Sequence, residues 1–262
     1  MKLLKISFTC MIAFCECSLS MQEETCVFRE ARGWEEVCRL TQGFVGSEEN
    51  RLFLTDCDDA LLRYANATSS EVELTDPRVP QALLELEATG WKIAALTSRD
   101  NFIGKTCLHP QFKKLGISFK SVLPEEDFCA SALKEAWARG TQIDCDCETG
   151  AIFTTCVSLS VLFQNDQTFL VCGRLLPLPR ADLRQAQSSP ESWALVDKAI
   201  QRAVTCSKGE ALAAATHVGL LSKPDVLAFV DDDVDNLTSV AEYCRLFSIR
   251  SLMIRYVAES QD

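Results

Sequence analysis

Three short apolar runs in this sequence each end in polar residues, and this pattern restricts the fold more than any other feature. The runs are Arg51–Asp56, Trp91–Thr97 and Asp225–Asp231, and helical patterns at Pro80–Thr89 and Asn236–Phe247 lie between and after them. Apolar runs without alternation are typical of strands that are covered on both faces, as in a parallel sheet. Strands that alternate with helices favour βαβ units. We therefore predict an α/β fold with an open parallel sheet.

The same alternation continues on both sides of these runs. Helices are also predicted over Trp34–Phe44, Glu191–Val204 and Gly209–Leu221, and a last strand over Ile249–Tyr256. A chain of 262 residues, 47% of them hydrophobic, can bury one substantial core. We expect this core to consist of residues 21–100 and 191–262.

The stretch between these two parts, residues 101–190, has a less regular pattern. It indicates a helix around Ala130–Arg139 and short strands at Ala151–Thr155, Leu159–Phe163 and Thr168–Cys172. A stretch of this length exceeds a simple crossover between two core strands. We therefore predict an inserted, cap-like subdomain, followed by an exposed loop that returns the chain to the core.

The polar residues at the strand ends indicate a site. In open α/β sheets, ligands bind beyond the carboxyl ends of the strands. The side chains expected there are Asp56, Asp58, Thr97, Asp231 and Asp232. Carboxylates that converge need a positive counter-charge, and oxygen ligands favour a hard cation such as Mg²⁺. The sequence therefore predicts a magnesium site at this edge of the sheet.

The N-terminal segment resembles a secretory signal. Lys2 and Lys5 precede the apolar stretch Ile6–Cys15, and small residues follow up to Ser20. We expect residues 1–20 to be a signal peptide of an exported protein, periplasmic or secreted. The segment is too short to span a bilayer as a helix. The alternative is an ordinary buried N-terminal strand or helix.

The charge and the cysteines exclude several kinds of partner and site. A net charge of −11 without a basic cluster offers no surface for nucleic acid or anionic lipid. Of fourteen cysteines, Cys10, Cys15 and Cys17 would leave with the signal peptide; the other eleven are scattered, and Cys145 and Cys147 form the only tight pair among them. Without a second pair or a partner histidine, this pair lacks the usual spacing of a zinc site. Most of the cysteines are interpreted as small buried hydrophobic residues.

Four motifs in order resemble those of the haloacid dehalogenase (HAD) superfamily. The first, an apolar strand followed by Asp-x-Asp, is Leu52–Leu61, and the second, a strand ending in a hydroxyl residue, is Ile93–Arg99. The third, a lysine that opens a helix, is Ser207–Leu212, and the fourth, Asp-Asp-x-x-x-Asn after a strand, is Phe229–Asn236. The C-terminal part is most similar to an uncharacterised family of secreted HAD-like bacterial proteins. The resemblance implies a Rossmann-like fold and phosphate chemistry.

The resemblance also implies a catalytic role for four residues. Asp56 would attack phosphorus and become an aspartyl-phosphate, and Asp58 would act as general acid and then general base. Thr97 would donate a hydrogen bond to the transferring phosphoryl group, although Ser98 could take this role. Lys208 would offset the charge that Asp56 shares with the phosphate. Its alternative is a solvated lysine at the start of a helix.

Magnesium ligands follow from the same resemblance. Asp231 would bind Mg²⁺ beside Asp56 and the backbone carbonyl of Asp58, and Asp232 would act through water. Arg99 either reaches the phosphate or a substrate carboxylate, or forms a surface salt bridge. This interpretation requires Lys208 and Asp231 to lie within reach of Asp56.

Two functions lead the alternatives at this point; a phosphotransferase or mutase with an acceptor other than water, and a metal-binding acidic protein with accidental motifs, are two more. The first is an Mg²⁺-dependent phosphohydrolase that acts on a small phosphomonoester. The second is a secreted binding or effector protein with the same fold and an idle site. One departure favours the second, because Ala60 stands where the family usually has Thr or Val. This substitution removes a hydroxyl that could form a hydrogen bond at the turn after Asp58.

Overall fold

The computed structural model describes most of the chain. The described residues are 25–44, 50–65, 71–139, 141, 143–155, 162–165, 168–171, 174–176 and 206–258. The expected signal peptide (1–20), the helix at 191–204 and the return loop after 176 lie outside them. Among the described residues, no helix has both the length and the apolar character needed to cross a bilayer.

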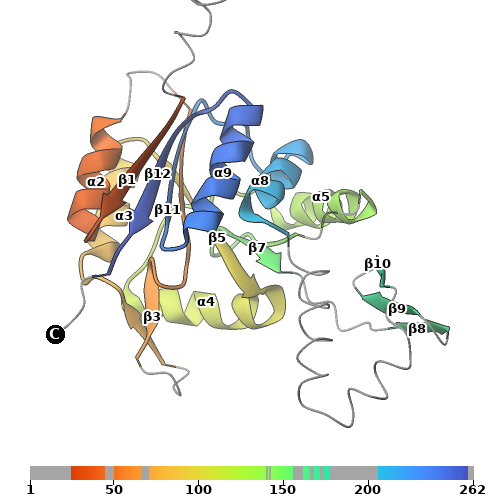
Figure 1. The fold of residues 1–262 in the computed structure, drawn as a ribbon. Coiled ribbons are helices and arrows are strands. Elements are labelled where there is room, and N and C mark those ends of the chain that lie inside the picture. Colours follow the sequence, from red (N-terminus) through yellow and green to blue (C-terminus); the bar gives the residue numbers. More distant parts are fainter. Residues whose placement is uncertain are drawn as a thin grey trace, which may run out of the picture.

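A seven-stranded sheet forms the centre of the fold (Figure 1). Its order is β1 (Cys26–Ala31), β12 (Arg250–Tyr256), β11 (Val226–Asp231), β2 (Arg51–Thr55), β5 (Lys92–Asp100), β7 (Ala151–Thr155) and β6 (Asp144–Asp146). All neighbouring strands pair in parallel except β6, which runs antiparallel to β7 at one edge. The prediction of an α/β fold with an open, mostly parallel sheet is therefore confirmed.

Helices cover both faces of this sheet, so two apolar clusters form its core. On one face lie α2 (Trp34–Gly43), α3 (Val79–Ala88) and α4 (Asn101–Leu115). On the other lie α5 (Glu126–Ala138), α8 (Lys208–His217) and α9 (Val234–Leu246). Alternate residues of the central strands enter opposite clusters, as with Phe53 on the first face and Leu54 on the second. This double burial explains why the strands read as continuous apolar runs.

The prediction of an inserted subdomain over residues 101–190 is wrong for the first half of this range. Residues 101–155 contain α4, α5, β6 and β7, and β7 pairs in parallel with β5 in the main sheet. The structure therefore shows further α/β elements of the core where a subdomain was expected. The sequence conceals α4 because Gly104 and Pro110 interrupt its helical pattern. Gly104 is nevertheless suited to its place, since a Cβ there would lie 2.1 Å from the Phe153 ring.

Two small antiparallel sheets complete the described structure. β8 (Leu162–Asn165), β9 (Thr168–Val171) and β10 (Arg174–Leu176) form a three-stranded sheet in the second half of the expected insertion. A cap function for this part remains a prediction. β3 (Leu62–Tyr64) and β4 (Val72–Leu74) form a pair that begins directly after the turn at residues 57–61. This pair therefore starts at the edge of the sheet where the site was predicted.

Candidate functional site

The ends of β2 and β11 bring two acidic residues to one lysine. The backbone N–H of Asp56 donates to the carbonyl of Val230 at 2.9 Å, which joins the end of β2 to β11. Lys208 Nζ lies 2.7 Å from Asp56 Oδ1 and 2.6 Å from Asp231 Oδ2. The interpretation of the sequence required Lys208 and Asp231 to lie within reach of Asp56, and they do. The lysine side chain is only 1% exposed, so it is not a solvated lysine at a helix start.

Lys208 is held in place by the start of α8. Ser207 caps this helix: its hydroxyl accepts from the backbone N–H of Glu210, and the Glu210 carboxylate accepts from the N–H of Ser207. This reciprocal capping box fixes the first turn. Gly209 lets α8 approach α9 closely, because a Cβ there would lie 2.2 Å from the carbonyl oxygen of Ser239. The cap and the glycine together position the lysine over the strand ends.

Asp231 is fixed through both of its oxygens. Oδ2 accepts from Lys208, and Oδ1 accepts from the backbone N–H of Asp233 at 2.8 Å and from Asn236 Nδ2 at 3.2 Å. Asp233 in turn caps α9, since its carboxylate accepts from the N–H of Asp235. The Asp-Asp-x-x-x-Asn pattern thus builds a turn that orients a fully buried carboxylate.

Burial dominates the electrostatics of these three groups. Desolvation, followed by repulsion from Asp231 and Asp58, raises the pKa of Asp56 to about 7 despite the attraction of Lys208. Desolvation alone would lower the pKa of Lys208, but the two carboxylates outweigh it and the pKa rises. Lys208 is therefore a fixed positive charge, and more negative charge faces it than it can neutralise.

The carboxylate oxygens fit a hard divalent cation. Asp56, Asp231 and Asp232 each offer an oxygen, and these atoms lie within 4.8 Å of one another. Asp56 Oδ1 is buried and lies 2.7 Å from the Lys208 ammonium, which also serves Asp231. One ammonium cannot neutralise three carboxylates, and a divalent cation would supply the remaining positive charge. Oxygen-only ligands are those that Mg²⁺ prefers.

The Asp58 side chain is paired with Arg99 and lies outside the cluster of Asp56, Asp231 and Asp232. Arg99 Nε donates to Asp58 Oδ2 at 2.8 Å, and the guanidinium also contacts Oδ1 at 2.5 Å. The arginine side chain is 8% exposed, so the pair differs from the expected surface salt bridge. Thr97 is fully buried within β5, three residues before the end of the strand, and its hydroxyl accepts from the N–H of Arg99 at 3.2 Å. Arg99 therefore links Thr97 to Asp58.

Further neighbours of Arg99 are not predicted by the sequence. Its guanidinium donates to Gln111 Oε1 at 2.7 Å and lies 6.0 Å from the centre of the Tyr64 ring. Gln111 belongs to α4 and Tyr64 to β3, and neither element was predicted. The only indication in the sequence is the position of Arg99 itself, directly after the hydroxyl residues that end a strand.

The turn after Asp58 has another hydroxyl in place of the one missing at Ala60. The carbonyl of Ala60 accepts from Thr75 Oγ1 at 2.6 Å and from Trp34 Nε1 at 3.0 Å. Asp59 takes a left-handed conformation with φ of 56°, which an aspartate tolerates better than most residues. The turn is therefore anchored from α2 and from the loop after β4.

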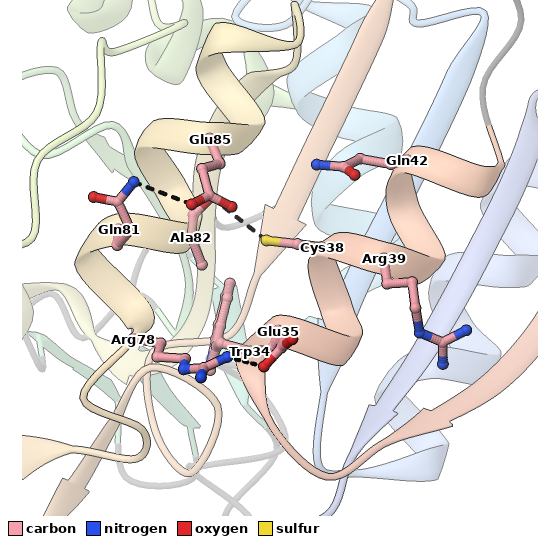
Figure 2. A pocket seen from close by; sticks show the side chains of 9 residues that line it. All are labelled: Trp34, Glu35, Cys38, Arg39, Gln42, Arg78, Gln81, Ala82 and Glu85. Atoms are coloured by element: carbon pink, nitrogen blue, oxygen red, sulfur yellow. Dashed lines mark hydrogen bonds and ion pairs between the residues drawn. The ribbon is translucent and has the colours of Figure 1, made fainter.

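A surface pocket of about 470 Å³ between α2 and α3 lies outside this group of residues. Figure 2 shows two pairs among its polar side chains, Arg78 with Glu35 and Gln81 with Glu85, while Arg39 and Gln42 also line it. Cys38 Sγ faces the carbonyl of Ala82 at 3.7 Å. None of the residues predicted for the site lines this pocket. The pocket is therefore separate from the predicted site.

Comparison of the chain with family models, with curated proteins and with solved structures finds no match. The case for a function therefore depends on the geometry of the site and on the motifs of the sequence.

Proposed function

We propose that this chain is an Mg²⁺-dependent phosphohydrolase of the HAD type, which acts on a small phosphomonoester through an aspartyl-phosphate at Asp56. The observation that supports it most is the bridge of Lys208 between Asp56 and Asp231. Three motifs that are far apart in the sequence meet in this bridge, in the arrangement that the chemistry needs. Most phosphoryl-transfer catalysis is positioning and charge stabilisation, and this group offers both.

Each side chain would have a defined task in the reaction. An Asp56 oxygen would attack phosphorus while the leaving alkoxide takes a proton from Asp58, and Asp58 would then activate the water that hydrolyses the acyl-phosphate. Lys208 would stabilise the negative charge on Asp56 and the phosphoryl oxygens. Asp56, Asp231 and, through water, Asp232 would hold Mg²⁺, which would neutralise further charge on the phosphoryl group.

A second candidate function rests on the Asp58–Arg99 pair. Both oxygens of the expected general acid are engaged by one guanidinium, and a carboxylate that is held in this way donates no proton. Catalysis therefore requires Arg99 to release Asp58, for example by turning toward the phosphate. If the pair persists, the protein is an idle member of its fold class that binds a ligand without turnover.

Hydrolysis of p-nitrophenyl phosphate by the full chain distinguishes the two functions. We expect activity that requires MgCl₂, is abolished by EDTA, and falls by at least about two orders of magnitude in Asp56→Asn and Asp231→Asn. Asp225→Asn is the matched control, because Asp225 precedes the same strand, β11, at its opposite end and is exposed. Its activity should equal that of the unchanged chain.

The proposal fails if a folded protein with bound Mg²⁺ hydrolyses no member of a broad phosphomonoester panel. Mg²⁺ binding without turnover would favour the binding protein. Activity that survives in Asp56→Asn would exclude the covalent route through this residue.

A further inference from the structure

Three cysteines from separate elements meet at the edge of the sheet that ends in β6. Cys129 lies on α5, Cys145 in β6, and Cys147 in the turn that leads from β6 to β7. Their sulfur atoms all lie within 4.8 Å of one another, and the sulfurs of Cys129 and Cys147 are 2.9 Å apart. The sequence shows only the Cys145–Cys147 pair, and the fold provides the third thiol.

The local structure fixes this arrangement. The Asp146 carboxylate accepts from the N–H of Glu148 at 3.0 Å and from the Thr149 hydroxyl at 2.7 Å, which holds the turn that carries Cys147. Cys129 and Cys145 are buried where α5 packs on the sheet, while Cys147 is partly exposed. The group is thus preformed and can be reached from one side.

Its chemistry suits a soft or borderline cation. Thiolates are preferred ligands of Zn²⁺, and tetrahedral Zn–S bonds of about 2.3 Å place two sulfurs roughly 3.8 Å apart. The observed grouping can accept this geometry with small side-chain movements. Structural zinc sites are closed by four protein ligands, often three or four of them cysteines.

The surroundings can provide the fourth ligand and a counter-charge. A surface pocket of about 340 Å³ opens onto the cysteines and is also lined by Lys105, Glu126 and Glu148. Either acid could complete the coordination. Lys105, which lies 2.7 Å from Asp144 Oδ1, places a positive charge on the same wall. Three thiolates and a divalent cation carry a net negative charge, so this lysine would offset it.

We propose that Cys129, Cys145 and Cys147 form a zinc site that fastens α5 to the edge strand β6. Each thiol loses its proton when the ion binds. The zinc site is separate from the cluster of Asp56, Asp231 and Asp232, and its role is structural. A disulfide between Cys129 and Cys147 is the competing use of the same residues, since it would leave Cys145 alone and allow no three-thiolate site.

Cobalt substitution in the full, reduced chain tests the proposal. Co²⁺ bound by thiolates gives a charge-transfer band in the near ultraviolet and strong visible bands when tetrahedral, and Zn²⁺ should displace it. We expect these bands to saturate at one equivalent and to be lost in Cys145→Ser and Cys147→Ser. Cys38→Ser is the control, because Cys38 is a buried cysteine on α2, in the other apolar cluster. It should keep the bands, and Zn²⁺ should raise the melting temperature of the control but not of Cys145→Ser.

Three results would overturn the proposal. One is the absence of thiolate bands in a chain that circular dichroism shows to be folded. Another is a set of bands that persists unchanged in Cys145→Ser, because the ion would then be bound by other cysteines. The third is a Cys129–Cys147 disulfide found by mass spectrometry in protein purified without added oxidant, which would assign the residues to a disulfide.

Discussion

The buried ion pairs of Lys208 are the residue-scale feature on which the proposed function depends. One cation serves two carboxylates, and the side chains of Lys208 and Asp231 are almost entirely removed from water. Removing one member of such a group leaves a buried charge without compensation, whereas exposed pairs contribute little. Stability and chemistry are therefore coupled at this site.

Lys208→Met tests this coupling. In the absence of Mg²⁺ we expect the free energy of unfolding to fall by about 3–5 kcal/mol, because Asp56 and Asp231 then repel each other in a buried environment. Saturating Mg²⁺ should restore part of the loss. Urea unfolding measures both effects. Lys114→Met is the control, since Lys114 pairs with Glu71 at the surface, and it should leave the midpoint unchanged. Equal midpoints for the two variants would show that the Lys208 pairs contribute nothing to stability.

The raised pKa of Asp56 predicts a dependence of stability on pH in the metal-free protein. The native carboxyl has a pKa of about 7, against an ordinary value of 3.8, so between these values the native state holds more protons than the unfolded state. The stabilisation that this proton contributes is therefore fully present below the ordinary pKa and is lost as the pH rises through the native pKa.

Asp56→Asn isolates this contribution. Relative to Asp56→Asn, we expect the urea midpoint of the unchanged chain in EDTA to fall between about pH 4 and about pH 7. The difference should shrink when Mg²⁺ is present, because the cation stabilises the ionised carboxylate. Parallel pH profiles for the two proteins in EDTA would contradict the assignment of a raised pKa to Asp56.

At the scale of elements, the approach of α8 to α9 places Lys208 over the strand ends. Gly209 permits this approach, and Gly209→Ala would bring a Cβ within 2.2 Å of a backbone oxygen. Because backbone cannot move aside as a flexible side chain does, we expect α8 to shift, with a loss of about 1–3 kcal/mol in stability and weaker Mg²⁺ binding. Gly43→Ala, at the end of α2, meets no atom of the described residues within 4 Å and should be nearly neutral in thermal unfolding. A neutral Gly209→Ala would show that the position of α8 is adjustable.

Most helices and strands around the site could be predicted from the sequence, because their apolar periods are clear. β2, β11 and α9 lie within a few residues of their predicted bounds. Several elements escaped prediction, and α4 and β1 did so for different reasons. Glycine and proline interrupt the pattern of α4, and β1 is an edge strand whose side chains Arg29 and Glu30 are exposed, so its apolar run is too short to recognise.

At the scale of the whole molecule, topology creates the site. β2 lies between β11 and β5 in the sheet, so the strand ends that carry Asp56, Thr97 and Asp231 become neighbours although the chain visits them far apart. The motif order predicts this meeting but not the Asp58–Arg99 pair, because the geometry of a side-chain pair depends on packing that no local pattern encodes. For the same reason, the assignment of residues 101–155 to an insertion was wrong. β7 pairs with β5, and this pairing between distant parts of the chain is not encoded in a local pattern.

Mg²⁺ should stabilise the whole fold if the carboxylates of Asp56, Asp231 and Asp232 bind it. An ion that binds only the native state adds RT ln(1 + [L]/Kd) to stability, which is about 2.7 kcal/mol at one hundred times the Kd. We expect MgCl₂ to raise the melting temperature of the full chain above that in NaCl of equal ionic strength, since general screening of the −11 net charge contributes in both salts. This additional rise in melting temperature, in MgCl₂ over NaCl, should vanish in Asp231→Asn and persist in Asp225→Asn. An equal excess in both variants would place the bound ion elsewhere on this acidic protein, and the strand-end carboxylates would then lose their role as its ligands.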